Sequence, residues 1–232
     1  MPIIHDEEFG KITIRRSARA SQVRLRVAPD GTLRASLPVY APTFLVRRLV
    51  KSSREELRQL LSQAQPQVDY SDGMQIGKSH TLIVRPSMSS SIQVHRRGQQ
   101  VIVSLPSHVS LQDSNVIREV RDSIIAAFRV EAKSYLPKRL SFLAKKSNFN
   151  YKKVRFSHAS GRWGSCTSEG TISLNIALMK LPFELIDYVI IHELAHTRHM
   201  NHSSEFWQVV EAGDPRYKSH RAALKHESPS IS

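Results

Sequence analysis

The stretch from Pro182 to Trp207, PFELIDYVIIHELAHTRHMNHSSEFW, decides how the rest of this chain is interpreted. Ile186, Ile190 and Leu194 recur every four residues, which is the period of a buried helix face. Pro182 suits the first turn of such a helix, where its missing N–H costs nothing. We therefore expect a helix that runs through the HELAH sequence at the centre of the stretch.

HELAH is an HExxH motif, whose residue spacing is typical of a metal-binding helix. His192 and His196 would project from one side of the helix, one turn apart, so that both could bind one ion. Glu193 is rotated about 100° from His192 at 3.6 residues per turn. It would therefore flank the ion without binding it, which is the position of a general base for a metal-bound water.

A catalytic zinc needs a third protein ligand and an open position. His199 continues the same helical face, but it lies about 10 Å from His192 along a straight helix, too far to share an ion. Asn201 tolerates the left-handed conformation of a return turn, and His202 follows it directly. We therefore predict His202 as the third ligand. The alternatives are a structural or vestigial site, or a coincidence of histidines on a half-buried helix.

The composition indicates a globular, basic protein. Thirty-four Lys and Arg against twenty Asp and Glu give a formal charge of +14 in 232 residues. That field favours anionic partners, and contact with a polyanion through the basic surface is one interpretation. A solvated surface is the simpler one, because the cations are spread along the chain without a recognisable nucleic-acid motif.

Two further features bear on the cellular setting. No apolar run approaches the length of a membrane span, so no membrane partner is expected. The first residues lack a signal-peptide pattern, and the single cysteine, Cys166, excludes an intramolecular disulfide. Together these favour a cytoplasmic location.

Hydrophobic periodicity divides the chain into three regions. Residues 1–106 are expected to be β-rich with one helix, 107–226 to form a zincin-like catalytic region, and 227–232 to be a disordered tail. In the first region, strands near 12–14, 23–27 and 33–37 include a hairpin turning at 29–31, and a helix follows over 42–64 until Pro66 breaks it. Further strands are expected over 80–105, and no internal repeat is evident.

In the second region, a helix from Ser110 is expected to kink or end near Pro137, with a separate basic helix to about residue 146. Strands near 154–156 and 171–174 would place the metal helix beside a sheet. A final short helix is expected over 217–225.

The GRWGSC sequence at 161–166 leaves several alternatives open. Trp163 suits a packing anchor, and Arg162 could bind a carboxylate or phosphate of the substrate. Cys166 is either a small buried residue or a zinc-bound thiolate, although the latter would close the position that catalysis needs. Farther on, Tyr217 or His220 could stabilise a developing oxyanion, or Tyr217 could be an ordinary half-buried side chain.

The motifs GRWGSC, ISLN, DYVIIHELAH, NHS and FW, in this order, resemble the YgjP-like family of zinc metallopeptidases. The N-terminal RRSARASQVRLRVAPDGTLRASLP is similar to the family's opening hairpin. Gly161 departs from the usual Ser of SRWGSC. The resemblance implies a zincin-like fold with ligands at His192, His196 and His202 and with Glu193 as base. It also leaves the substrate open between peptides and nucleotides such as UTP.

The sequence thus predicts an α+β fold, with a zincin-like metal helix beside a β-sheet and a β-rich N-terminal half. The expected function is zinc-dependent hydrolysis by a zinc-bound water that Glu193 activates, most simply of peptides. One alternative is a nucleoside triphosphate (UTP-type) pyrophosphatase on the same zinc site, with Arg162 holding the anion. Another is a non-catalytic, zinc-stabilised module that binds nucleic acid through its basic surface.

Overall fold

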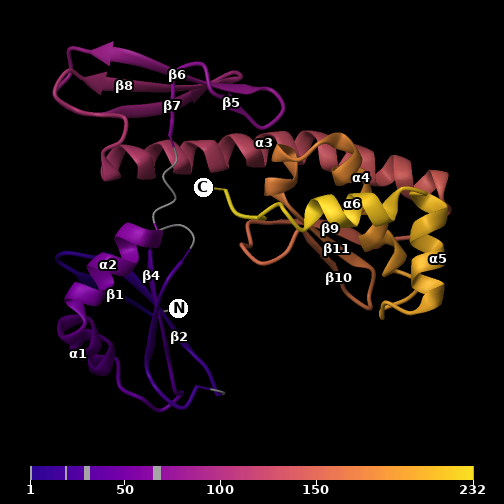
Figure 1. The fold of residues 1–232 in the computed structure, drawn as a ribbon, viewed down its shortest axis with the longest axis horizontal. Coiled ribbons are helices and arrows are strands. Elements are labelled where there is room, and N and C mark those ends of the chain that lie inside the picture. The colour runs from indigo at the N-terminus through magenta and orange to yellow at the C-terminus, as the bar shows by residue number, and fades with distance from the viewer. Residues whose placement is uncertain (1, 19, 29–31, 65–68, 232) are drawn as a thin grey trace. The chain divides into compact units, whose positions relative to one another are not determined.

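The structure is a computed structural model that describes residues 2–18, 20–28, 32–64 and 69–231 (Figure 1). The turn expected at 29–31 and the break at Pro66 lie outside these residues. The chain forms two compact units, 1–68 and 69–231. The boundary therefore falls near residue 68 and not at the expected 106, because the second group of strands packs on the long helix that follows it.

The N-terminal unit is a four-stranded sheet covered on one face by two helices. The strand order is β1-β2-β4-β3, in which β2 and β4 are parallel and the outer pairs antiparallel. Inward-facing side chains such as Ile12, Ile14 and Leu37 form the core with Val46 and Val50 of the first helix. The elements are β1 (Ile3–Asp6), β2 (Gly10–Arg16), β3 (Arg24–Val27), β4 (Leu33–Leu37), α1 (Phe44–Ser52) and α2 (Arg54–Ala64).

The single helix expected over 42–64 is thus two helices. Ser53 separates them, since its backbone leaves the helical conformation (φ −113°, ψ 25°) while its N–H still bonds to the Leu49 carbonyl.

A second four-stranded sheet opens the C-terminal unit and repeats the topology of the first. Its strands are β5 (Gln75–Ile76), β6 (His80–Ser87), β7 (Gln93–Arg97) and β8 (Gln100–Pro106). Their order is β5-β6-β8-β7, again with the two central strands parallel and the outer pairs antiparallel. Ser-Leu-Pro ends β8 at 104–106, as it ends β4 at 36–38. The chain therefore contains an internal structural repeat, contrary to the expectation from its sequence.

One helix, α3 (Ser114–Lys146), extends through the C-terminal unit. At 1.5 Å per residue its 33 residues span about 50 Å. The second sheet packs along one part of it, and the later elements of the unit, among them α4, pack along another (Figure 1). The expected interruption at Pro137 does not occur. The fully buried Leu136 and Leu140 on either side hold the helix against its neighbours, which offsets the lost backbone hydrogen bond.

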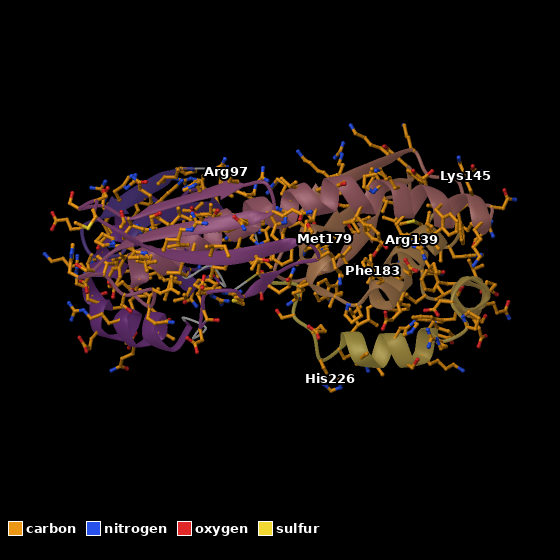
Figure 2. All side chains as sticks on the ribbon, turned by 90° about the horizontal axis from the view of Figure 1, so that it is seen from above. Arg97, Arg139, Lys145, Met179, Phe183 and His226 are labelled. Atoms are coloured by element: carbon orange, nitrogen blue, oxygen red, sulfur yellow. The ribbon has the colours of Figure 1, made fainter. Side chains whose placement is uncertain are left out.

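The region beyond α3 places a buried helix beside a three-stranded sheet. Helix α4 contacts α3, α5, α6, β10 and β11. Arg139 of α3 binds Asp187 of α4 through two hydrogen bonds, of 2.7 and 2.5 Å, close to the start of α4 at Phe183 (Figure 2). The elements are β9 (Lys153–Ser157), β10 (Gly164–Cys166), β11 (Thr171–Asn175), the 3-10 helix η1 (Ile176–Lys180), α4 (Phe183–Ala195), α5 (Ser204–Gly213) and α6 (Tyr217–Leu224).

These elements confirm the mixed α+β class with a β-rich N-terminal half. The segment 227–231, expected to be a disordered tail, contacts the protein: Asn175 donates to the Pro229 carbonyl, Lys180 donates to that of Ser230, and Ile231 is buried. Among the described helices, none combines the length and apolar character that a membrane crossing requires.

A buried carboxylate joins the second sheet to α3. Glu131 accepts hydrogen bonds from the backbone N–H groups of Lys78 (2.7 Å), Ser79 (2.8 Å) and His80 (3.2 Å). The Ser79 hydroxyl (2.8 Å) and His80 Nδ1 (2.6 Å) complete the set. Gly77 is required beside it, because a Cβ there would lie 2.3 Å from Glu131 Oε2 at a φ of +59°. Five donors thus stabilise one buried charge.

We expect Glu131→Gln to lower the free energy of unfolding by about 3 kcal/mol, because an amide would turn an N–H₂ group toward converging donors. Chemical denaturation measures the loss. Glu119→Gln, an exposed carboxylate on the same helix, is the matched control and should change stability by less than about 0.5 kcal/mol. Equal stability of the two variants would show that Glu131 does not join the sheet to the helix.

Candidate metal centre

The candidate metal centre lies at the C-terminal end of α4 and the turn that follows it. Helix α4 is buried on nearly all sides, as its run of Leu, Ile and Val residues predicts. It ends at Ala195, with His196 as C-cap, and the chain turns back before Ser203 caps α5 by accepting a hydrogen bond from the Phe206 N–H. This turn brings His202 back beside the helix.

Three histidines converge at this turn. Nitrogens of His192, His196 and His202 all lie within 4.8 Å of one another. The Nε2 atoms of His192 and His202 are 3.2 Å apart. Two nitrogens bonded tetrahedrally to one zinc at about 2.05 Å would be about 3.3 Å apart. His192 and His196 are half-buried and His202 is exposed, so the cluster opens to solvent on the His202 side.

The aromatic ring of Phe206 packs against all three imidazoles. Its centroid lies 5.0 Å from that of His192, 4.6 Å from His196 and 4.7 Å from His202, and the residue is fully buried. Trp207 stacks on His202 at 5.6 Å. The FW pair therefore restricts the rotamers of the histidines, a role that the sequence did not reveal because it depends on the tertiary fold.

The backbone also orients one imidazole. His196 Nδ1 lies 3.1 Å from the carbonyl oxygen of His199, so Nδ1–H can donate there and leave Nε2 free to bind an ion. The His199 ring is not part of the histidine cluster, in agreement with the spacing argument. Burial lowers the pKa of His196, and burial with the neighbouring His196 and His202 lowers the pKa of His192 to about 3. Both rings are therefore neutral near pH 7, as ligands must be.

Glu193 follows the first histidine and faces β10. Only 5% of the residue is exposed, and its Oε2 atom is buried without a hydrogen-bond partner among the described residues. Burial raises the pKa of this carboxyl to about 8, against the opposing effect of the Arg162 charge. A buried acid with an unpartnered oxygen has the character of a general base or acid.

Gly164 of the GRWGSC sequence provides the space for this carboxylate. A Cβ at residue 164 would lie 2.6 Å from Glu193 Oε1 and 2.7 Å from its Cγ. No larger residue fits unless Glu193 moves. The requirement for glycine is thus set by a residue 29 positions away, and a local sequence pattern cannot identify such a partner.

Asn175, the last residue of the ISLN sequence, holds the loop that leads to Gly164. It is fully buried, and its Nδ2 group donates to the carbonyls of Ala159 (2.6 Å) and Arg162 (2.9 Å). Its backbone N–H donates to the Trp163 carbonyl at 2.8 Å. Asn175 therefore positions the strand that packs beside Glu193.

The other candidate residues lie at different depths around the centre. Arg162 is exposed, with its charge close enough to act on Glu193. Burial, with the charge of Glu193, raises the pKa of Cys166 to about 11, which keeps the thiol protonated near pH 7.

Tyr217 is buried and stacks on Trp207 at 5.4 Å, so it supports the ring that packs on His202. His220 is held by Asp214, 2.7 Å from its Nδ1.

The chemistry of these groups fits a divalent metal ion such as zinc. Imidazole nitrogens are suitable zinc ligands, and three protein ligands would leave one tetrahedral position open. The facing Nε2 atoms of His192 and His202 would suit the binding of an ion, and the unpartnered oxygen of Glu193 would be available to a water beside it.

A histidine cluster of this kind, beside a buried acid in an α+β fold, defines a metallohydrolase. The sequence matches the family model described as the YgjP-like metallopeptidase domain over residues 21–227, and the chain therefore belongs to the YgjP-like metallopeptidase family. The resemblance noted in the sequence motifs is thereby confirmed.

Two solved structures show partial similarity. One is the metallopeptidase zymogen of Pyrococcus abyssi abylysin, with 28% identity and a TM-score of 0.36 over 39% of this chain and 92% of that chain. The other is the metallopeptidase zymogen of Methanocaldococcus jannaschii jannalysin, with 18% identity and a TM-score of 0.35 over 39% of this chain and 93% of that chain. No curated protein matches the sequence significantly.

The contact between Gly164 and Glu193 can be tested by a double-mutant cycle. We expect Gly164→Ala to lower the free energy of unfolding by about 1–3 kcal/mol, because the added methyl group overlaps the buried carboxylate. In a Glu193→Ala background the same substitution should cost less than about 0.5 kcal/mol. Gly161→Ala is the control, since a Cβ there meets nothing within 4 Å. The same cost in both backgrounds would contradict the contact.

Proposed function

We propose that this protein is a zinc-dependent metallopeptidase in which His192, His196 and His202 hold the ion and Glu193 is the general base. The observation that carries the proposal is the convergence of three imidazole nitrogens within 4.8 Å, beside a buried carboxylate with an unpartnered oxygen. Membership of a metallopeptidase family supports the same class of chemistry.

Zinc in this position would act as a Lewis acid, which acidifies water and polarises the carbonyl under attack. Glu193 would take the proton from the attacking water through its free oxygen and later deliver it to the leaving amine. Burial favours proton uptake by this carboxyl, because it disfavours the charged form. The wall formed by β10 limits the positions that the carboxylate can adopt, which keeps proton transfer short.

The sheet beside Glu193 supports a peptide substrate. Strand β10 is at the edge of the three-stranded sheet, where β11 is its one partner strand among the described residues. An extended peptide could add to the open edge through main-chain hydrogen bonds, which need no particular side chain. Because Gly164 of this strand touches Glu193, the added peptide would pass close to the base.

A nucleotide pyrophosphatase remains the second candidate. The supporting observation is electrostatic: the charge of Arg162 acts on Glu193, and that of Arg221 acts on His192. These cations could attract a triphosphate. Arg198 does not contribute, because its guanidinium donates to the carbonyls of Ser147 and Asn148 and stacks on Phe149.

Metal analysis tests the ligand assignment. We expect one zinc per chain in the wild-type protein, loss of most of it in His202→Ala, and full retention in His199→Ala, since only the backbone of residue 199 takes part in the site. If His199→Ala loses the metal and His202→Ala retains it, the assignment of ligands is wrong.

Activity measurements test the base and the substrate together. Zinc-loaded protein should cleave an unfolded protein substrate in a chelator-sensitive reaction, and Glu193→Gln should keep its zinc while kcat falls by about 10² or more. Near-normal turnover by the metallated variant would remove Glu193 from the mechanism.

Hydrolysis of UTP is assayed in parallel, with the wild-type protein and with Arg162→Ala. The pyrophosphatase would replace the peptidase on three results together. The wild-type protein would hydrolyse UTP in a chelator-sensitive reaction, Arg162→Ala would lose that activity, and neither protein would cleave the peptide substrate.

A further inference from the structure

The sheet of the N-terminal unit has an open face that carries positive charge. Side chains alternate along each strand, so that those directed away from α1 and α2 lie opposite the apolar core. On β2 these are Lys11, Thr13 and Arg15, and on β3 they are Arg24 and Arg26. All four cations are exposed. Together with Ser36 of β4 they line a depression of about 920 Å³, and we call this surface the basic face.

The strand register arranges these side chains as a grid. Arg15 lies opposite Ser36, and Ser36 lies opposite Arg24, so one row crosses three strands. The adjacent row holds Thr13 and Arg26 on either side of β4. Neighbouring strands are about 4.8 Å apart, and residues two apart on a strand are separated by about 7 Å. Several guanidinium groups therefore reach one patch from both sides.

Acidic side chains of this unit gather elsewhere. Asp6 and Glu8 form ion pairs with Arg54 and Arg58 of α2, at distances of 2.5 to 3.1 Å. Across the described ranges, by contrast, Lys11, Arg15, Arg24 and Arg26 make no ion pair, and no acidic side chain lines the basic face. Charges of one sign that are held together repel each other and attract anions.

The internal repeat shows that this fold does not require the positive charge. With the two Ser-Leu-Pro sequences aligned, the strand registers match Arg24 with Gln93 and Arg26 with His95. Of these three arginines, only Arg15 has a charged residue, Arg85, at the equivalent position of the second sheet. A sheet of the same topology thus forms without most of these cations, and their presence on the first sheet needs another reason.

We propose that the basic face binds the phosphate backbone of a nucleic-acid duplex. Guanidinium groups donate paired hydrogen bonds to phosphate, and the hydroxyls of Thr13 and Ser36 can donate further ones. The described residues lining the face include no aromatic ring on which the bases of a single strand could stack. Recognition is therefore of the backbone, independent of base sequence and strongly dependent on salt.

Binding of the full-length protein to a fluorescein-labelled DNA duplex of about 25 base pairs tests the proposal by anisotropy over a range of salt concentrations. Sequence-independent binding of this kind has a Kd of about 10⁻⁶ to 10⁻⁴ M. The face variant combines Arg15→Gln, Arg24→Gln and Arg26→Gln. If each arginine contacts one phosphate, the slope of log K against log salt should fall by about 2 to 3, and Kd at low salt should rise about tenfold or more.

The control variant removes the same charge from the other side of the unit, through Arg47→Gln, Arg48→Gln and Lys51→Gln at exposed positions on α1. It should change Kd less than about threefold, because it alters only the distant field. Equal weakening by both variants, or no wild-type binding at about 50 mM salt, would overturn the proposal. Tighter binding to phosphatidylserine vesicles than to the duplex would also overturn the proposal. Arg24→Gln alone, at an exposed edge-strand position, should lower the slope by about one and guards against misfolding of the triple variant.

Discussion

The burial of the Glu193 carboxylate is the constraint on which the C-terminal part of the structure depends. A polar group removed from water normally requires hydrogen-bond partners, yet Oε2 has none among the described residues. The neighbouring elements accommodate it through space: β10 presents a glycine, and Asn175 fixes the loop that brings that glycine into place. A polar network that satisfied both oxygens would make the carboxyl a weaker proton acceptor.

The histidines depend on a different kind of support. Phe206 contacts all three rings, and Trp207 and Tyr217 continue the stack outward from His202. Packing restricts the imidazoles before any ion arrives, so less conformational entropy is lost on binding. The exposed position of His202 complements this rigidity, because an ion or a substrate can enter on that side.

Local periodicity predicted the parts of this structure that depend on neighbours in sequence. The helix that ends at His196 and the return of His202 follow from helix geometry and the need for the chain to turn back. The turn does not use the expected left-handed Asn201, since Asn148 is the one non-glycine residue with a positive φ among the described residues. By contrast, the contact of Gly164 with Glu193 joins residues far apart in sequence, and no local pattern encodes it. The prediction of an interruption at Pro137 was wrong for the converse reason, because tertiary burial outweighs the local preference of proline.

The division of the first half was missed because most residue identities differ between the two sheets, and because β8 has the buried run Val101–Val103 where β4 alternates. Ser-Leu-Pro is too short to reveal it. The contact that decides the boundary, between Glu131 and the start of β6, spans about fifty residues and depends on backbone N–H groups that any sequence possesses. Such a contact leaves little trace in composition.

The repeated sheet also shows how the same topology is packed and decorated in two different ways. Each copy has an apolar face covered by helices of its own unit, α1 and α2 for the first sheet and α3 for the second. The second copy is anchored to α3 by Glu131, and α3 in turn packs against the helix that carries the histidines, so its variation is restrained by the catalytic region. One topology thus carries two surface chemistries in this chain, with Arg24 and Arg26 on the first sheet at the positions that Gln93 and His95 occupy on the second.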